Sequence, residues 1–263
     1  MRVLITGSSG FIGSHLKTKL LEQGHEVRDC DLKTGERAET IIITNAGEWK
    51  TQFVIHLAAS IDVFESFDKP ELYWKNNVEN TTRIQHLCAG HSIPLIYASS
   101  FHSKKWWTSP YAMTKKVNEE TAGSNQVGLR FTTVYGEGDY EDSFMKKLEN
   151  GTLEYVTDRV RDFIHVSDVV DVITHLMKDM QKPGHPMTGA YDIGTGIGHN
   201  VADLSRFAGH PVSLKVGESY EIDNDVADLK PIQEMLTDLK GTIWQHKINV
   251  KEYIENGYRV EGL

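Results

Sequence analysis

The chain has 263 residues, which is enough for one sizeable hydrophobic core, and 25% of them are charged, as in ordinary globular proteins. The formal net charge is −9 and lysine and arginine form no run longer than a pair, so nucleic acid and anionic membranes are poor partners, and no apolar stretch is long enough for a membrane helix. Only two cysteines occur, Cys30 and Cys88, so we expect reduced thiols in a cytoplasmic protein.

The chain opens with a predicted strand, a glycine turn and a predicted helix. Residues 3–6 are apolar and predict a buried strand, and residues 11–23 have helical spacing. Between them, Gly7, Gly10 and Gly13 are spaced G-x-x-G-x-x-G. Gly7 allows a sharp turn, Gly10 allows backbone N–H groups to approach a pyrophosphate, and Gly13 allows close packing of helix on strand. This order predicts a dinucleotide-binding βαβ unit.

The second predicted strand, at 27–31, ends in an acidic residue. Asp31 follows Gly7 by 24 positions, close to the spacing at which such folds contact the adenosine ribose. A carboxylate there accepts hydrogen bonds from the ribose hydroxyls and repels a 2′-phosphate, so Asp31 favours NAD over NADP. The alternative is a solvated aspartate in a turn.

Strands and helices continue to alternate along the chain. Apolar, β-branched runs predict further strands at 40–44, 53–57, 95–99 and 127–133, and helical patterns at 70–89 and 111–122. This alternation predicts an α/β protein with a doubly wound parallel sheet, the Rossmann fold.

Beyond Gly136 the pattern becomes mixed, with a predicted helix at 166–180 and a predicted strand at 190–193. We therefore expect residues 1–136 to form the dinucleotide-binding domain. Residues 137–263 should form a smaller mixed α/β substrate lobe, partly interleaved with it.

Three residues near the middle of the chain could carry chemistry. Tyr111 and Lys115 lie four residues apart in a predicted helix, so they share one face. An adjacent ammonium stabilises a phenolate, which makes Tyr111 a candidate general acid and base near neutral pH. Ser100 follows the strand at 95–99, at the carboxyl edge of the sheet, where open α/β folds bind ligands.

Taken in order, these motifs resemble those of the extended short-chain dehydrogenase/reductase family, in its NAD-dependent epimerase/dehydratase branch that acts on nucleotide sugars. Further motifs of the same resemblance are His56-Leu57-Ala58-Ala59, Asn76-Asn77-Val78 and Arg161-Asp162-Phe163-Ile164-His165-Val166. The resemblance covers residues 1–193. It implies NAD as cofactor, a nucleotide sugar as substrate, and a homodimer formed through the helices that hold 77–89 and 111–122.

The resemblance also assigns roles to individual residues. Tyr111 is the acid and base, Lys115 binds the nicotinamide ribose and lowers the tyrosine pKa, and Ser100 orients the reacting oxygen. Thr133, where the family commonly has asparagine, and Arg161 bind the substrate. The cofactor-binding residues are Gly7, Gly10, Phe11, Ile12, Gly13, Asp31, Leu57, Ala58, Ala59 and Asn76, together with Tyr111 and Lys115.

Three features depart from the family pattern. Only ten residues, 101–110, separate Ser100 from Tyr111, so the substrate lid is reduced. Phe101 and His102 replace the Asp-Glu pair with which sugar 4,6-dehydratases eliminate water. The segment 217–228 lacks an arginine that relatives often use to hold the substrate phosphates.

These observations favour an NAD-dependent nucleotide-sugar epimerase that transiently oxidises a sugar hydroxyl. A first alternative is an NAD(P)H-dependent keto-sugar or carbonyl reductase, in which His102 would supply a second acid. A second alternative is a non-catalytic NAD(P)-binding regulatory protein. The reduced lid and the missing arginine favour that alternative, whereas Ser100, Tyr111 and Lys115 oppose it.

Other residues admit plainer interpretations. His56 and His165 lie inside apolar runs, as structural histidines do. Arg161 could be a structural partner of Asp162 or of another carboxylate. Trp106 and Trp107 could cover the substrate or bind a partner. The histidines and cysteines form no zinc-binding grouping, so we expect no metal.

Overall fold

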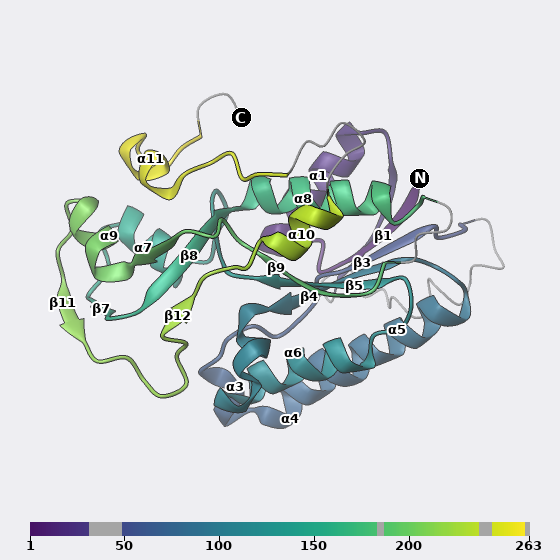
Figure 1. Cartoon of the computed structure of the whole chain (residues 1–263), viewed down its shortest axis with the longest axis horizontal. Coiled ribbons are helices and arrows are strands. Elements are labelled where there is room, and N and C mark those ends of the chain that lie inside the picture. Colours follow the sequence, from purple (N-terminus) through teal and green to yellow (C-terminus); the bar gives the residue numbers. More distant parts are fainter. Residues whose placement is uncertain (32–48, 183–186, 237–243, 261–263) are drawn as a thin grey trace. The chain divides into compact units, whose positions relative to one another are not determined.

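The computed structural model describes residues 1–31, 49–182, 187–236 and 244–260, so the strand predicted at 40–44 lies outside the described residues. The chain forms two compact units (Figure 1). Unit 1 contains Met1–Arg130 and Val172–Tyr191, and unit 2 contains Phe131–Asp171 and Asp192–Leu263. The chain therefore passes between the units three times.

A six-stranded sheet runs through unit 1 in the order β2-β1-β3-β4-β5-β9. β1 pairs in parallel with both β2 and β3, and β3 pairs in parallel with β4. Because β2 and β3 lie on opposite sides of β1, the sheet has its switch point there, which is where such sheets bind ligands. The strands are β1 (Arg2–Thr6), β2 (Glu26–Cys30), β3 (Phe53–His56), β4 (Leu95–Ser100), β5 (Gln126–Phe131) and β9 (Gly189–Ile193).

Helices cover both faces of this sheet, as predicted for a doubly wound fold. Helix α1 (Phe11–Glu22) lies on one face, and α5 (Asn80–Gly90) and α6 (Pro110–Thr121) lie side by side on the other (Figure 1). Part of the core between the sheet and α5 consists of Leu4, Cys30, Val54, Ile84, Cys88, Ile93, Leu95 and Tyr97.

The helix predicted at 70–89 is present but is not uniform. It begins as α4 (Pro70–Tyr73), widens into the π-helical turn η2 (Trp74–Glu79), and continues as α5. Pro70 occupies the first turn, where its missing N–H costs no helical hydrogen bond. The short helix α3 (Glu65–Asp68) precedes it.

The single strand predicted at 127–133 is wrong in one respect, because two strands occupy this segment. β5 ends at Phe131 in the six-stranded sheet, and β6 (Thr133–Tyr135) pairs in parallel with β8 (Val160–His165) in unit 2. The side chains on both sides of Thr132 favour extended backbone, so the sequence pattern does not reveal the change of sheet.

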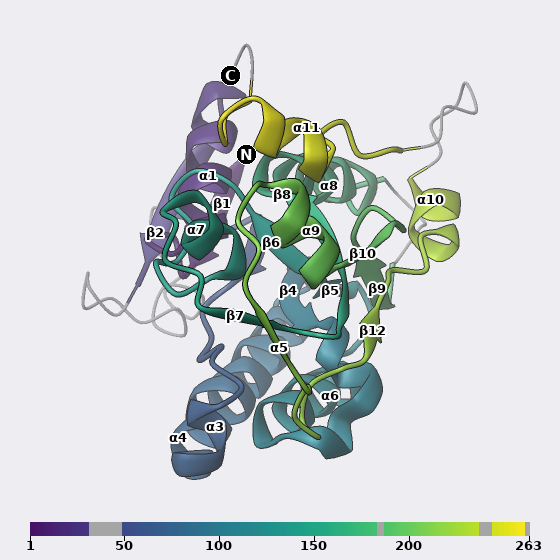
Figure 2. The same ribbon diagram turned by 90° about the vertical axis from the view of Figure 1, so that its left-hand side faces the viewer.

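Unit 2 combines short strands with short helices, of which α7, α9, β6 and β8 face the viewer in Figure 2. Its core gathers Tyr135, Met145, Leu148, Leu153, Val156, Phe163, Val201, Ala202, Leu204, Val250, Tyr253 and Ile254. The remaining elements are α7 (Phe144–Glu149), β7 (Tyr155–Thr157), β10 (Gly198–Asn200), α9 (Val201–Phe207), β11 (Ser213–Lys215), β12 (Asn224–Asp225), α10 (Lys230–Met235) and α11 (Val250–Glu255). Helix α8 (Val166–Asp179) contributes residues to both units.

Candidate active site

The turn between β1 and α1 requires its glycines. Gly7 has a φ of +71°, and a Cβ atom on it would lie 2.7 Å from the backbone nitrogen of Ala58. A Cβ on Gly13 would overlap the carbonyl group of Gly7. Any side chain at either position would force the turn away from β3 or α1 away from the turn. The observed packing matches the steric tasks predicted for these two residues.

This turn has the features of a pyrophosphate site. The residue that caps α1 is Gly10, and no side chain caps the helix there, so its N-terminal N–H groups face the turn. Asp31 directly follows β2, and its Oδ2 accepts a hydrogen bond from Ser9 N at 3.2 Å. An acidic side chain beside the glycine turn at the switch point of the sheet fits a dinucleotide with an unphosphorylated adenosine ribose.

The segment that follows β3 supplies the next wall of this region. Leu57, Ala58 and Ala59 are half-buried, and Ala58 N donates to Thr6 Oγ1 at 3.3 Å. His56, just before them, is buried between Thr6 Oγ1 at 2.6 Å and Thr81 Oγ1 at 2.9 Å. Burial, with a smaller contribution from Lys115, lowers the pKa of His56 to about 3. His56 is thus a buried histidine with a hydrogen-bond partner at each ring nitrogen, as its structural interpretation predicts.

The π-helical turn places two consecutive asparagines, Asn76 and Asn77, next to Ser60 in the loop that follows β3. Asn76 Nδ2 donates to Ser60 Oγ at 3.1 Å. Asn77 is fully buried and exchanges two 2.8 Å hydrogen bonds with the backbone of Ser60, while its Nδ2 also donates to Thr114 Oγ1 at 3.1 Å. In a regular α-helix adjacent side chains point about 100° apart, so the wider turn explains how both reach one residue. Asn77 therefore ties this loop to α6.

Helix α6 positions the predicted acid–base pair. Ser109 caps it by accepting from Ala112 N at 3.1 Å, and Pro110 begins it, which places Tyr111 in the first turn. Lys115 is one turn further along and 2% exposed, with Nζ 5.7 Å from the centre of the Tyr111 ring.

The ammonium of Lys115 is held on the sheet side of the helix. Its Nζ donates to the carbonyl oxygen of Ala98 on β4 at 3.0 Å. Burial lowers the pKa of Lys115 to about 8, and Glu119 opposes this shift. The group therefore remains mostly protonated at neutral pH, beside a phenol whose ionised form it stabilises.

Ser100 ends β4 and is buried. It also begins the next element, because its Oγ accepts from His102 N at 3.3 Å and caps the 3₁₀-helix η3 (Phe101–Thr108). Eight of the ten residues between Ser100 and Tyr111 form η3, which has a kink at Lys105 and packs on α6. Trp106 and Trp107 lie on η3 with 42% and 65% of their surface exposed.

Sequence reasoning missed the residue that holds these elements together. The Glu119 carboxylate accepts from Ser99 Oγ and Ser103 Oγ, both at 2.6 Å, and from Arg130 at 2.7 and 2.9 Å. These partners come from β4, η3 and β5. The available signal was the position of Glu119 one turn beyond Lys115, on the same helix face.

Unit 2 contains a cavity of about 710 Å³. Thr133 on β6 and Arg161 on β8 both line it, together with Phe163, which pairs with Thr133 in the β6–β8 register. Two of the three residues predicted to bind substrate, Thr133 and Arg161, therefore line one cavity, whereas the third, Ser100, is not among its lining residues. A volume of this size is in the usual range for a small-molecule site.

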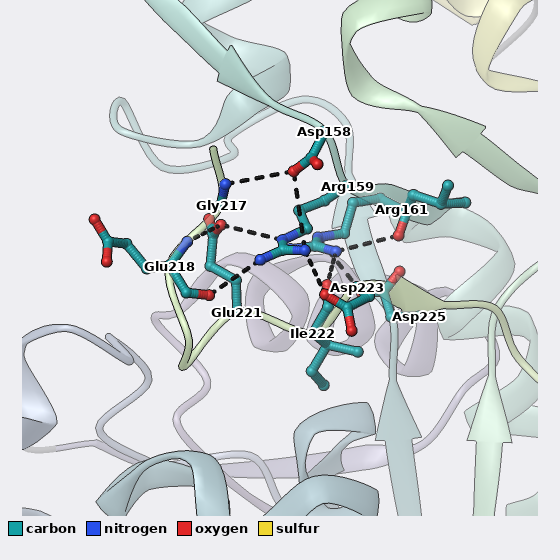
Figure 3. A network of polar contacts seen from close by, with 10 residues as sticks. Asp158, Arg159, Arg161, Gly217, Glu218, Glu221, Ile222, Asp223 and Asp225 are labelled. Atoms are coloured by element: carbon teal, nitrogen blue, oxygen red, sulfur yellow. Dashed lines mark hydrogen bonds and ion pairs between the residues drawn. The ribbon is translucent and has the colours of Figure 1, made fainter. Parts of the chain in front are cut away.

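Arg161 is not the partner of its neighbour Asp162. Its Nη1 donates to the carbonyl oxygens of Val160 at 3.1 Å and Ile222 at 2.5 Å, and its Nε lies 3.9 Å from Asp225 Oδ2 (Figure 3). The carboxylate of Asp162, which is fully buried, accepts instead from Thr195 N and Oγ1, Gly196 N and Ala227 N. Successive residues of a strand point to opposite faces, which separates the two charges.

A second arginine, Arg159, directly precedes β8 and was not foreseen. Arg159 pairs with Glu221 at 3.5 Å and with Asp223, and its Nη2 donates to Glu218 O at 3.2 Å (Figure 3). A Cβ atom on Gly217 would overlap its guanidinium group. Arg159 therefore fastens the segment 217–223 to β8 at the rim of the cavity.

In the described ranges, no three or more histidine, cysteine, aspartate or glutamate residues lie close enough to hold a metal ion. No helix within those ranges is both long and apolar enough to cross a membrane.

Comparisons with known proteins agree on one family and one fold. Residues 3–194 match the model of the NAD dependent epimerase/dehydratase family. Protein CapI of Staphylococcus aureus is 32% identical over 72% of this chain and 73% of its own length. A UDP-glucose 4-epimerase of Mycolicibacterium smegmatis is 29% identical over 78% of this chain and 80% of its own length. Among solved structures, MoeE5 in complex with UDP-glucuronic acid and NAD has a TM-score of 0.78, with 24% identity and 97% of both chains covered, which supports the same fold.

Proposed function

Because this chain belongs to the NAD dependent epimerase/dehydratase family, we propose that it is an NAD-dependent nucleotide-sugar epimerase. The observation that carries this proposal is the pair formed by Tyr111 and Lys115. The ammonium of Lys115 is buried beside the Tyr111 ring and held by a carbonyl of β4, an arrangement suited to a phenol that exchanges protons near neutral pH.

In this proposal, Tyr111 and Ser100 act at the oxygen atom of the reacting hydroxyl group, and Lys115 acts through Tyr111. NAD, when bound, would supply the acceptor and donor of the hydride at the carbinol carbon. Tyr111 Oη takes the proton of the same hydroxyl group, and Lys115 stabilises the phenolate until that proton is returned. Ser100 Oγ donates a hydrogen bond to the keto oxygen. Inversion results when the hydride returns to the opposite face of the sugar.

We assign substrate binding to the cavity of unit 2. The guanidinium of Arg161 is suited to a diphosphate, since its planar fork binds phosphate oxygens in pairs. Thr133 lines the same cavity and offers a hydroxyl group for hydrogen bonding. Both assignments rest on their shared position on β6 and β8 and on the family resemblance.

The test is interconversion of epimers at catalytic levels of cofactor. The protein is incubated with UDP-glucose, UDP-galactose or UDP-glucuronic acid and NAD at about one hundredth of the sugar concentration, and the sugars are followed by NMR. We expect epimers to form with no net accumulation of NADH, and Arg161→Ala to raise the apparent substrate constant more than it lowers turnover. Stoichiometric consumption of NADH or NADPH with a keto sugar would establish the reductase alternative instead.

We also propose that the protein is a cytoplasmic homodimer that pairs through the α4–η2–α5 helix and α6. Three large apolar side chains of these helices, Leu72, Trp74 and Met113, are 40–44% exposed, which is the kind of surface that an interface covers. Cys30 and Cys88 are both buried thiols, in keeping with a reducing compartment. Light scattering of the wild type should give twice the chain mass, and Trp74→Lys should shift it toward the monomer.

A further inference from the structure

His102 has no task in the proposed hydride transfer. Oxidation of a carbinol needs one proton acceptor at the hydroxyl oxygen, and Tyr111 with Lys115 supplies it. The structure nevertheless places this second titratable side chain beside Tyr111 and Ser100. An imidazole exchanges protons near neutral pH, and with two ring nitrogens it serves as either acid or base.

The backbone fixes this imidazole in place. His102 N donates to Ser100 Oγ at 3.3 Å, and Nδ1 of the ring lies 3.4 Å from the same oxygen. The ring meets Tyr111 edge to face, with the ring centres 6.0 Å apart and the planes at 67°. Because η3 begins at the cap formed by Ser100, His102 is set by a helical turn and not by a loop.

Ser100 Oγ thus lies 3.4 Å from Nδ1 of His102, whose ring packs against the ring of Tyr111. In the proposed function, Ser100 holds the keto oxygen of the oxidised sugar. The carbon atom adjacent to the keto group is about one bond length from the carbonyl carbon. His102 contacts the same serine hydroxyl group as the keto oxygen does, so its imidazole is within reach of the hydrogen atom on that adjacent carbon. The carbonyl makes that hydrogen acidic.

We propose that His102 removes and returns a proton at the carbon atom adjacent to the keto group of a keto-sugar nucleotide. The C–H bond breaks, its proton moves to an imidazole nitrogen, and its electron pair forms the C=C bond of an enolate. Hydrogen bonds from Ser100 and Tyr111 stabilise the enolate oxygen. The reverse step restores the C–H bond, and the cycle consumes no oxidant or reductant. The inference rests on the proposed function for the source of the keto group within the catalytic cycle.

The experiment supplies that keto group directly. The wild-type protein, loaded with NAD, is incubated at millimolar concentration of UDP-4-keto-6-deoxyglucose in D₂O, and deuterium at the carbons next to the carbonyl is followed by NMR against an enzyme-free control. We expect enzyme-dependent deuteration, reduced at least ~100-fold in His102→Gln. A second variant, His102→Phe, keeps the ring packing on Tyr111 and should lose exchange equally. His91→Gln, at an exposed site after α5, should behave like the wild type.

Hydride transfer is measured on the same variants as NADH formed in a single turnover with the UDP-sugars named above, and it should change less than about threefold in His102→Gln. No wild-type exchange above the enzyme-free rate, or unchanged exchange in both variants, would overturn the proposal. Equal loss of exchange and of hydride transfer would also overturn it, since His102 would then serve only to position Ser100. If no nucleotide sugar is epimerised, the proposed function fails, but the exchange result still decides the role of His102.

Discussion

Glu119 and Arg130 form a two-pronged ion pair in which Arg130 Nε donates to Oε1 at 2.9 Å and Nη2 donates to Oε2 at 2.7 Å. The Glu119 side chain is only 5% exposed. Its remaining hydrogen bonds go to Ser99 and Ser103, on either side of Ser100. One carboxylate on α6 thereby fixes the chain on both sides of the serine predicted to be catalytic.

We expect Glu119→Gln to destabilise the protein by about 3–5 kcal/mol, because it leaves the Arg130 guanidinium without its counter-charge in a mostly buried site. The matched control is Glu120→Gln on the same helix, where an exposed pair with Lys116 should contribute under about 1 kcal/mol. Urea unfolding of the three proteins measures the difference. Equal urea midpoints for Glu119→Gln and the wild type would contradict the stabilising role of the Glu119–Arg130 ion pair.

Tyr111→Phe should leave NAD affinity nearly unchanged and lower turnover by about 10²–10⁴-fold, the usual contribution of a positioned acid or base. Lys115→Met should weaken both NAD binding and turnover, because it removes a predicted ribose contact and the charge that stabilises the phenolate. Calorimetric titration with NAD and steady-state rates separate the two effects. Tyr140→Phe, at a half-exposed site of unit 2, is the control. Turnover within threefold of the wild type in the Tyr111 variant would remove the catalytic assignment.

Asp31 should make the protein prefer NAD to NADP by about 1–3 kcal/mol, because a 2′-phosphate would meet its carboxylate and leave polar groups mispaired. Asp31→Asn removes the charge and should narrow this gap. Glu26→Gln, at an exposed position on β2, the strand that precedes Asp31, should leave the gap unchanged. Titration of each protein with both cofactors is the measurement. Equal affinities in the wild type would rule out this role.

Asp225 gives a prediction about pH. Burial raises the pKa of its carboxyl group to about 7, against the opposing effect of Arg161. Between about pH 4 and 7 the unfolded chain has released this proton while the folded chain retains it, so raising the pH through this range lowers the free energy of unfolding. The loss should be on the order of 1–3 kcal/mol and should be smaller in Asp225→Asn.

Thermal unfolding of both proteins at pH 5 and pH 8 tests this prediction. The difference between the two proteins isolates Asp225 from the other titrating groups. Asp203→Asn, whose side chain is exposed on α9, should show the wild-type dependence. A steeper pH dependence in Asp225→Asn would mean that the sign is wrong.

Much of this architecture could be predicted because its signals are local. The turn at Gly7 and the capped start of α6 each depend on a few consecutive residues, and the positive φ of Gly7 follows directly from its residue type. The family and its NAD cofactor followed from several such motifs in order, and both are confirmed.

What sequence reasoning missed depends on residues far apart in the chain. Glu119 on α6 pairs with Arg130 on β5, a different element. Arg159 pairs with Glu221 and Asp223, which lie about 60 residues later in the chain. No periodicity encodes such pairings. The division of the segment after Gln126 between two sheets escaped for the same reason, since its strand propensity is continuous while its partners are not.

The position of β9 matters while the protein is being made. It is the edge strand of the six-stranded sheet and lies beside β5. In the chain, however, residues 132–188 separate β5 from β9. During synthesis, the backbone N–H and C=O groups on one side of β5 therefore have no strand partner until β9 has left the ribosomal exit tunnel. An open edge pairs readily with other chains, so slow synthesis before β9 has left the exit tunnel should increase aggregation of the nascent protein more than slow synthesis after β9 has left it.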